Sequence, residues 1–397
     1  MTISPKQLAL RQQVLDQLYV HGPLSRTDIV HNTGITPATV STITGALLED
    51  HYLDELGEAH TTAVQAGRKK VLLQIAPGQR HFVGVDLGAK GFYFVLVDQQ
   101  GQVLDRVAHR FSHVFDPSES TPSTLVTALG AFLARHQEVP IQAVGVALPG
   151  HYLAAAQQIA SNHPHWLGFD LAPVSQAFGL PTYFENNAHA MAWTERLFST
   201  TPLDDNFIFL HVARGIFCST VHDGALYGRQ NPLVGEIAHT VVNPEGTLCE
   251  CGRHGCLCTY ASENDIIAKA RLLYETAPRT YLRQLVSDPA QITFTTVLQA
   301  YDLGDDGVIN TLNVAIKYLA AELNNLTLMI DARRLILHGR IFDRPALFER
   351  LQQYLNDNQF QFTSVTPKRL TVKPFTEFDG AIGGAGLAIG QELLGMA

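Results

Sequence analysis

The sequence contains no uninterrupted apolar run of about 18 residues, the length that a membrane-spanning helix needs. Its first residues, MTISPKQLALRQQ, lack an apolar segment followed by a small-residue cleavage site. We therefore expect no secretory signal, no membrane insertion and a cytoplasmic location. An excess of basic residues is also missing: the net charge is −9, so any contact with DNA must come from a local patch and not from a broadly basic surface.

Cysteine is scarce, with five residues in a chain of 397, yet four of them lie in the stretch LCECGRHGCLCTYAS at positions 248–262. In a reducing compartment such a cluster is a poor candidate for disulfides and is more often metal-binding or catalytic. A redox-active dithiol is typically spaced C-x-x-C near the start of a helix, whereas the spacing here begins C-x-C. Buried free thiols are the third interpretation, and the glycines between these cysteines do not favour it.

The first 75 residues have the pattern of short helices. Hydrophobic residues make up 46% of the chain and charged residues 16%, as in folded proteins, and the length suggests two or three domains. Gln7 to Tyr19 carries an apolar face at helical spacing. A second helix is expected to begin at Ser25, which with Asp28 is close to a capping box, and to end at Gly34.

A third helix is expected to follow a tight glycine turn. Thr36 can cap it, Pro37 fits its first turn, and we expect it to run through ATVSTITGALLEDHYL, residues 38–53. Two short helices joined in this way are typical of a helix-turn-helix. The next stretch, residues 54–75, has the pattern of a β-wing and carries the only basic cluster of this region.

These features favour DNA binding. Small polar side chains on the third helix suit the major groove, and basic residues of a wing suit phosphates or a minor groove. The alternatives are a three-helix bundle for protein contacts and an ordinary solvated charge run. The residues expected to contact DNA are Thr36, Pro37, Ala38, Thr39, Ser41, Thr42, Arg68, Lys69 and Lys70.

From residue 81 the pattern changes to strands and glycine turns alternating with helices. HFVGVDLGAKGFYFVLVDQQGQVL predicts three strands in succession, and IQAVGVALPG, FIFLHVARGIFCSTVHDGALYG and RRLILHGRI predict further ones. Helical stretches such as STLVTALGAFLARH and GVINTLNVAIKYLAAELNNLTLMI lie among them. This alternation predicts an α/β protein with two lobes.

Six motifs in this part of the chain resemble those of the ROK family, in the same order and spacing. They are VGVDLGAKG, VGVALPG, YFENNAHAMAWTERLF, LVGEIAHTVV, CECGRHGC and GAIGGAGLA. The resemblance covers residues 81–397 and implies a ribonuclease-H-like actin/hexokinase fold. That family includes sugar kinases and sugar-responsive repressors, and the N-terminal helix-turn-helix matches its repressor branch.

The resemblance also implies a domain organisation and a metal site. We expect a winged helix-turn-helix over residues 1–80, one lobe over 81–190 with 380–397, and a second lobe over 191–379. His239, Cys249, Cys251 and Cys256 match the four zinc ligands of the family, which implies a closed, structural Zn²⁺ site. Cys258 stands where the family usually has a Glu that reaches the sugar, and it is either a spectator thiol or a zinc ligand competing with His239.

Three departures from the kinases of the family predict that catalysis is lost, with no catalytic residue remaining. The D-x-G-G-T phosphate turn is replaced by Asp86-Leu87-Gly88-Ala89-Lys90, and the second glycine-rich turn by residues 212–217, VARGIF. The catalytic base, an Asp in the kinases, is replaced by Asn187. An amide cannot accept a proton at neutral pH, so we expect no enzyme.

The sugar-binding residues implied by the resemblance are better preserved: Asn162, Asn186, Asn187, Glu236 and His239. We therefore expect a sugar-responsive DNA-binding regulator of the repressor type for genes of carbohydrate metabolism. Its expected partners are operator DNA, a sugar or sugar-phosphate effector and a second copy of the chain, as a homodimer or a dimer of dimers. The alternatives are a divergent or residual sugar kinase and a regulator controlled by a protein partner.

Overall fold

The computed structural model describes residues 4–58, 70–161, 163–199, 205–358 and 368–396. The chain divides into two compact units, which are described separately: unit 1 comprises Met1–Leu203 and Glu377–Ala397, and unit 2 comprises Asp204–Thr376. Among the described residues, no helix is both long enough and apolar enough to span a bilayer.

Unit 1 begins with three helices, each started by a side-chain cap. They are α1 (Pro5–His21), α2 (Arg26–Thr33) and α3 (Pro37–Glu49). The capping box predicted at Ser25 is confirmed, because the Asp28 backbone N–H donates to the Ser25 hydroxyl and the Asp28 carboxylate accepts from the Ser25 N–H. Gly34 ends α2 with a φ of 69°, a left-handed conformation that glycine adopts without strain.

The prediction that the third helix continues to Leu53 is wrong. The helix α3 ends at Glu49, and His51 adopts a φ of 57°. Leu53 instead begins a strand, β2 (Leu53–Glu58), which pairs antiparallel with β3 (Val71–Ile75). The side chain of Leu53 is 1% exposed, so tertiary burial against this sheet outweighs the helical pattern of the sequence. A short strand, β1 (Leu24–Ser25), completes a sheet of order β1-β3-β2.

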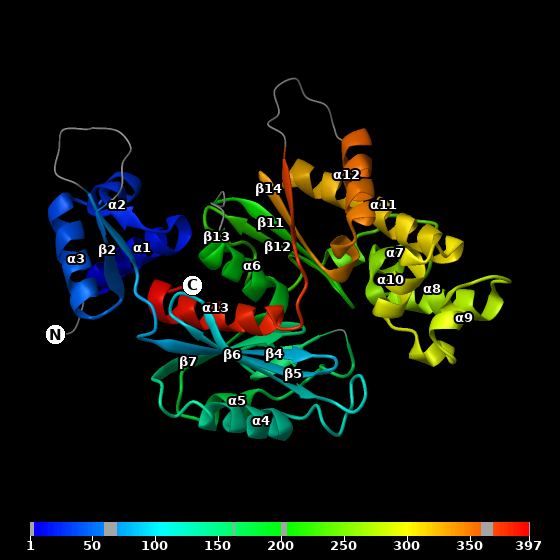
Figure 1. The fold of residues 1–397 in the computed structure, drawn as a ribbon, viewed down its shortest axis with the longest axis horizontal. Helices are drawn as coiled ribbons and strands as arrows, with labels where there is room; N and C mark the ends of the chain where they lie inside the picture. Colours follow the sequence, from blue (N-terminus) through cyan, green and yellow to red (C-terminus); the bar gives the residue numbers. More distant parts are fainter. Residues whose placement is uncertain (1–3, 59–69, 162, 200–204, 359–367, 397) are drawn as a thin grey trace. The chain divides into compact units, whose positions relative to one another are not determined.

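The remainder of unit 1 is a five-stranded sheet covered by helices on both faces. Its order is β10-β7-β4-β5-β6. The strand β5 pairs antiparallel with both β4 and β6, whereas β7 pairs parallel with both β4 and β10. The helices α6 and α13 lie on one face and α4 and α5 on the other (Figure 1). The bounds are β4 (His81–Gly88), β5 (Gly91–Asp98), β6 (Val103–Arg110), α4 (Pro122–Ala134), β7 (Ile141–Leu148), β8 (His151–Leu153), β9 (Gln158–Ala160), α5 (Ala172–Gln176), β10 (Thr182–Asn186), α6 (Asn187–Phe198) and α13 (Asp379–Leu394).

Glycines allow α13 to lie directly on the sheet. A Cβ atom on Gly145 of β7 would stand 1.9 Å from the carbonyl oxygen of Gly384, and one on Gly84 of β4 would stand 1.9 Å from that of Ala381. Such separations are far inside van der Waals contact, so side chains at these positions would force the helix away. The glycine-rich motif near the C-terminus is thus explained by close backbone packing.

Unit 2 repeats the same strand pattern around a second core. Its sheet has the order β13-β12-β11-β14-β15, antiparallel from β11 to β13 and parallel from β11 to β15. Buried side chains of β11 and β14, such as Leu210 and Leu337, pack with those of the long helix α11. The bounds are β11 (Phe207–Val212), β12 (Ile216–His222), β13 (Ala225–Leu226), η1 (Ile237–His239), α7 (Cys258–Ala261), α8 (Glu263–Thr276), α9 (Leu282–Leu285), η2 (Pro289–Gln291), α10 (Phe294–Asp302), α11 (Asp306–Met329), β14 (Arg334–His338), η3 (Arg340–Asp343), α12 (Pro345–Asp357) and β15 (Arg369–Lys373).

Candidate functional site

Unit 2 brings together the four residues predicted to bind zinc. One donor atom from each of His239, Cys249, Cys251 and Cys256 lies within 4.8 Å of every other. The Cys249 Sγ is 3.6 Å from the His239 Nδ1, and the Cys251 and Cys256 Sγ atoms are 3.6 Å apart. Ligands around a tetrahedral zinc ion stand roughly 3.5–3.8 Å from one another, so these separations and this donor set fit Zn²⁺.

The loop that carries the cysteines, residues 248–258, is held by its backbone and is termed the cysteine loop. The Cys249 N–H donates to the Arg253 carbonyl at 2.7 Å, and the Gly255 N–H donates to the Thr247 carbonyl at 2.8 Å. Gly252 and Gly255 have φ values of 85° and 65°, which explains the glycines of the motif. A hydrogen bond from the backbone N–H of Arg253 lowers the pKa of the Cys251 thiol, which favours the thiolate that a metal binds.

Cys258 is the first residue of α7 and lies at the edge of this cluster. Its Sγ is 3.5 Å from that of Cys249, but it does not belong to the group of donors that are all within mutual reach. The fifth cysteine, Cys218, is buried in β12, and burial raises the pKa of its thiol to about 12. The described geometry therefore favours the His239 set over a set with Cys258.

The residues expected to bind sugar are distributed over both units. Asn186 ends β10 and caps α6: its Oδ1 accepts from the Ala188 N–H at 2.9 Å and the His189 N–H at 3.3 Å, while its Nδ2 donates to the Gly150 carbonyl at 3.3 Å. Asn187 follows as the first residue of α6. In unit 2, Glu236 precedes η1 and His239 ends it. Asn162 lies outside the described residues.

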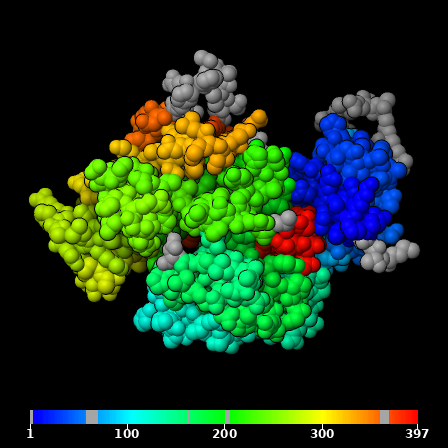
Figure 2. Space-filling view, turned by 180° about the vertical axis from the view of Figure 1, so that it is seen from behind, coloured from blue at the N-terminus to red at the C-terminus, as the bar shows by residue number. Residues whose placement is uncertain are grey.

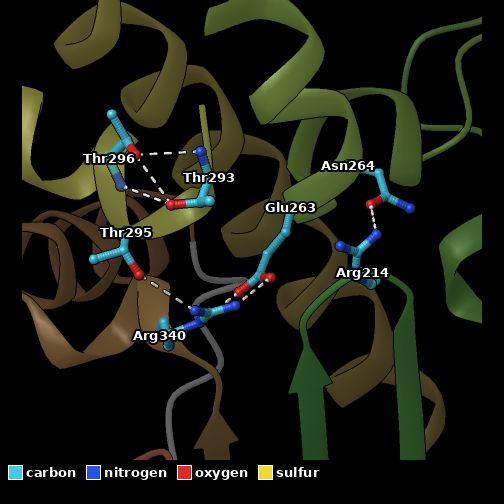
Figure 3. A network of polar contacts seen from close by, with 7 residues as sticks. All are labelled: Arg214, Glu263, Asn264, Thr293, Thr295, Thr296 and Arg340. Carbon is cyan, nitrogen blue, oxygen red and sulfur yellow. Dashed lines mark hydrogen bonds and ion pairs between the residues drawn. The ribbon is translucent and has the colours of Figure 1, made fainter. Parts of the chain in front are cut away.

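In unit 2, the turn that replaces the second phosphate-binding turn is occupied by charged side chains. The Arg214 Nη1 donates to the Asn264 Oδ1 at 3.1 Å, and burial lowers the pKa of this guanidinium. The Glu263 backbone N–H donates to the carbonyl of Ala213 in the same turn. Figure 3 shows Glu263 reaching toward Arg340, which follows β14.

The pair of Arg340 and Glu263 is bidentate, with a buried carboxylate and a partly exposed arginine whose side chain is 29% exposed. The Arg340 Nε and Nη2 donate to the two carboxylate oxygens of Glu263 at 3.1 and 2.8 Å, and its Nη1 lies 3.5 Å from the Thr295 hydroxyl on α10 (Figure 3). The Glu263 side chain is 5% exposed. Sequence reasoning missed this pair because its members are 77 positions apart and belong to no short motif.

In unit 1, the altered first phosphate turn contains an uncompensated acid. Asp86 lies in β4 between the buried residues Val85 and Leu87, and its Oδ1 is buried without a hydrogen-bond partner among the described residues. Its carboxyl packs against Gly380, where an added Cβ would lie 2.4 Å from the Asp86 Cγ. Desolvation, and then the charge of Asp379, raise the pKa of Asp86 to about 7.

The N-terminal helices present most of the predicted DNA-contacting residues to solvent. Thr36, Ala38, Ser41 and Thr42 are exposed, as is Pro37, and Thr39 is half-buried. The Thr36 hydroxyl caps α3, and the Thr42 hydroxyl donates to the Ala38 carbonyl at 3.0 Å. The Lys70 ammonium pairs with the Asp28 carboxylate at 2.9 Å. Arg68 and Lys69 lie outside the described residues.

The far end of α6 contacts the first helix of the chain. The Arg196 guanidinium makes two hydrogen bonds to the Asp16 carboxylate on α1, at 2.5 and 2.8 Å, and the Tyr19 ring meets the Phe198 ring edge-on. The Tyr19 hydroxyl donates to the Gln99 carbonyl at 2.6 Å. Figure 2 shows the N-terminal residues against the red C-terminal helix, and α1 packs on both α6 and α13. No sequence signal could have linked Arg196 to Asp16, which is 180 positions away.

Comparison with known proteins agrees with this architecture. The model of the ROK family matches residues 82–391. The xylose repressor of Bacillus subtilis is 24% identical over 334 residues, which are 83% of this chain and 82% of that protein. The N-acetylmannosamine kinase of Escherichia coli is 27% identical over 320 residues, which are 78% and 99% of the two chains.

A solved structure shows the same fold over almost the whole chain. The crystal structure of a ROK family transcriptional regulator, a homologue of the Mlc protein of E. coli, superposes with a TM-score of 0.77 at 22% identity and covers 98% of this chain and 97% of its own. The predicted α/β fold of the actin/hexokinase type is thereby confirmed for the region that follows the N-terminal helices.

Proposed function

The chain belongs to the ROK family, and we propose that it is a sugar-responsive, DNA-binding transcriptional repressor of carbohydrate-metabolism genes without kinase activity. The observation that carries this proposal is the combination of capped N-terminal helices with a replaced phosphate turn beside which Glu263 is paired with Arg340. The relative named xylose repressor supports it. Operator DNA, a sugar or sugar-phosphate effector and a cytoplasmic location belong to the same proposal.

Residues 1–80 are the DNA-binding part in this proposal, as a winged helix-turn-helix with α3 as its recognition helix. The exposed side chains of α3 suit base edges and phosphates, with Thr39 and Ser41 setting sequence choice. Arg68, Lys69 and Lys70 contribute to affinity through phosphates. The ROK part comprises one lobe of residues 81–190 with 380–397 and a second of residues 191–379. One helix-turn-helix per chain suits an inverted repeat bound by a dimer or a dimer of dimers.

The proposed loss of catalysis rests on the residue at the position of the catalytic base and on the replaced second phosphate turn. Asn187 has no titratable group with which to take a proton from a sugar hydroxyl. The Arg214 side chain and the Arg340–Glu263 pair stand at the turn where a kinase would expose backbone amides to phosphate. The similarity to the N-acetylmannosamine kinase supports a divergent sugar kinase as the second candidate function. ATP-dependent phosphorylation of a hexose or N-acetylmannosamine that Asn187→Ala abolishes would establish that candidate instead.

We also propose that His239, Cys249, Cys251 and Cys256 hold a structural Zn²⁺ ion. A bound zinc ion would link the cysteine loop to His239 in η1. The free energy of zinc binding would therefore add to the free energy of folding. Metal analysis of protein purified in reducing buffer should find about one zinc per chain. Cys256→Ser should lose the metal and unfold at lower temperature, whereas the control Cys218→Ser, at a buried cysteine outside the set, should keep it.

The helix α6 offers a physical connection between effector and DNA. Its first turn carries Asn186 and Asn187, expected to bind the sugar, and its last turn carries Arg196, which is bound to Asp16 of α1. Twelve residues of helix span about 18 Å, and a packed helix moves as a rigid body. A ligand that shifts the start of α6 therefore also shifts Arg196 and its contact with α1.

The test is operator affinity with and without ligand, after a thermal-shift screen of pentoses, hexoses, N-acetylhexosamines and their phosphates has found one that binds. Saturating ligand should weaken operator binding roughly 5–150-fold, the usual range of coupling between sites. Arg196→Met should bind operator and ligand but lose most of this coupling. The control Arg135→Met, at an exposed arginine paired with Asp105, should keep it. Unchanged operator affinity at saturating ligand would favour control by a protein partner.

A further inference from the structure

The cysteine loop contains two pairs of sulfur atoms, not merely one metal cluster. The Sγ atoms of Cys249 and Cys258 are 3.5 Å apart, and those of Cys251 and Cys256 are 3.6 Å apart. Each pair is about 1.5 Å beyond the length of a disulfide bond. Cys258 is outside the proposed ligand set, and its presence makes the number of thiols in the loop even.

In sequence order, one of these pairs lies inside the other. The chain turns between Cys249 and Arg253, where the Gly252 N–H donates to the Cys249 carbonyl and the Cys249 N–H donates to the Arg253 carbonyl. Leu248 and His254 form an antiparallel bridge across the turn. The inner pair, 251–256, and the outer pair, 249–258, are therefore nested, and both bonds can form at once without threading the chain.

The cysteines of the loop differ in exposure. Cys251 is exposed and Cys258 is half-buried, while Cys249 is 4% and Cys256 0% exposed. An oxidant dissolved in water therefore meets Cys251 first, and the nearest thiol that can resolve the product is Cys256. Oxidation of that inner pair removes two proposed metal ligands and leaves Cys249 beside Cys258, which then form the second pair.

We propose that the cysteine loop is a reversible oxidation site, at which hydroperoxides convert its four thiols into the nested disulfides 251–256 and 249–258. In each step a thiol sulfur attacks one peroxide oxygen, the O–O bond breaks, and a sulfenic acid forms with release of an alcohol, or of water when the oxidant is hydrogen peroxide. The partner thiol then attacks that sulfur, forms the S–S bond and releases one water. Two peroxides take four electrons from four thiols, and a dithiol reductant reverses the change.

The role of Cys258 is to keep this oxidation reversible. Without it, closure of the inner pair leaves Cys249 as a single thiol, open to sulfinic acid formation or to bonding with another chain. With it, every sulfur of the loop ends in a bond that a dithiol can reduce. The sulfur pairing stands on the loop geometry alone, whereas the accompanying loss of zinc rests on the proposed metal site.

The experiment uses the full-length protein with its metal content measured, treated with hydrogen peroxide and then blocked with N-ethylmaleimide under denaturing conditions. The adduct count should fall from five to one, at Cys218. Cleavage after Glu250, Arg253 and Leu257 puts the four cysteines of the loop on separate peptides. Non-reducing mass spectrometry should then find 249 linked to 258 and 251 linked to 256, and zinc should be released in parallel.

Two variants sharpen the result. Cys258→Ala should fold and hold metal like the wild type, yet after a peroxide and dithiothreitol cycle it should recover less zinc and show oxidised Cys249. Cys218→Ala should cycle like the wild type. A Cys258 that stays free after the inner pair has closed, crossed linkages, or full recovery by Cys258→Ala would each overturn the proposal. Nested linkages in a protein that contains no zinc would uphold it and refute the metal site instead.

Discussion

Two carboxylates, one in each unit, stand near the first hairpin of their sheets and have opposite surroundings. Glu263 in unit 2 is buried and receives two hydrogen bonds from the Arg340 guanidinium. Asp86 in unit 1 has a buried oxygen without a hydrogen-bond partner among the described residues, and the charge that most affects it is the like charge of Asp379. Only one of these buried acids is therefore neutralised by a cation.

The difference shows two outcomes when an acid loses contact with water. An arginine that offers two donors keeps the carboxylate ionised and fixes the elements that carry both groups. An acid without such a partner holds its proton to a higher pH, because burial penalises the charged form. The D-x-G-G-T motif of the kinases carries an Asp at the position of Asp86 as well, so the change in unit 1 lies in the residues that follow it. In unit 2, the Arg340–Glu263 pair lies beside the replaced turn.

The largest expected effect comes from breaking the compensated pair. Arg340→Ala leaves the Glu263 charge buried and alone, and loss of one partner of a buried pair costs about 3–5 kcal/mol. Urea unfolding should show that loss. Arg344→Ala, which removes an arginine paired with the exposed Asp302, is the matched control and should cost less than about 1 kcal/mol. Equal losses in the two variants would mean that the Glu263 carboxylate is not sealed from solvent.

A second variant of the same pair separates charge from packing. In the double variant Arg340→Met with Glu263→Leu, no buried charge remains, and apolar side chains of similar length fill the space. Most of the stability lost in Arg340→Ala should return, because well-packed apolar groups replace buried ion pairs at little cost. The measurement is the urea midpoint of the wild type, Arg340→Ala and the double variant at one pH. A double variant as unstable as Arg340→Ala would show that the pair acts through its specific geometry.

The raised pKa of Asp86 should make the stability of the fold depend on pH. Because the pKa of Asp86 is raised to about 7, its folded form binds more protons than the unfolded chain between about pH 4 and pH 7. Its contribution to stability is therefore complete below about pH 4 and is lost as the pH rises through 7. Asp86→Asn should be more stable than the wild type at pH 8, and this advantage should vanish toward pH 4.

The control for this pH dependence has the opposite sign. Hydrogen bonds from the Ser118 hydroxyl and N–H lower the pKa of the half-buried Asp116, so it stabilises the fold above the unfolded pKa and loses that effect in acid. Asp116→Asn should thus show its small deficit at neutral pH and none in strong acid. Parallel curves for the Asp86 and Asp116 variants across this range would contradict the assignment of Asp86 as uncompensated.

The smallest effect on stability is expected from an exposed pair. The Lys70 and Asp28 side chains are 53% and 36% exposed, and such pairs contribute roughly 0.2–1 kcal/mol. Lys70→Ala should therefore barely change the urea midpoint. If Lys70 also contacts a phosphate, the variant should reduce the slope of log K against log salt for operator binding by about 0.9. An unchanged slope would place Lys70 outside the DNA contact.

Much of the local structure and the membership of the Cys/His cluster could be predicted from the sequence. The caps at Ser25 and Thr36 depend on side chains within three residues of the helix start, so their hydrogen bonds follow from the local sequence. The cluster of His239 with three cysteines was implied by the resemblance to the ROK family, and the structure brings these four donors together. The end of α3 could not, because burial of Leu53 in the sheet decided it.

By itself the sequence determined the capped starts of the N-terminal helices and the alternation of strands and helices from residue 81, and its resemblance to the ROK family implied that a His and three Cys would meet. Only the tertiary structure decided which charges compensate one another. Arg340 meets Glu263 across 77 positions and Arg196 meets Asp16 across 180. The physical reason is range: caps and periodic patterns act between neighbours along the chain, whereas burial and ion pairing depend on which distant surfaces pack together and exclude water.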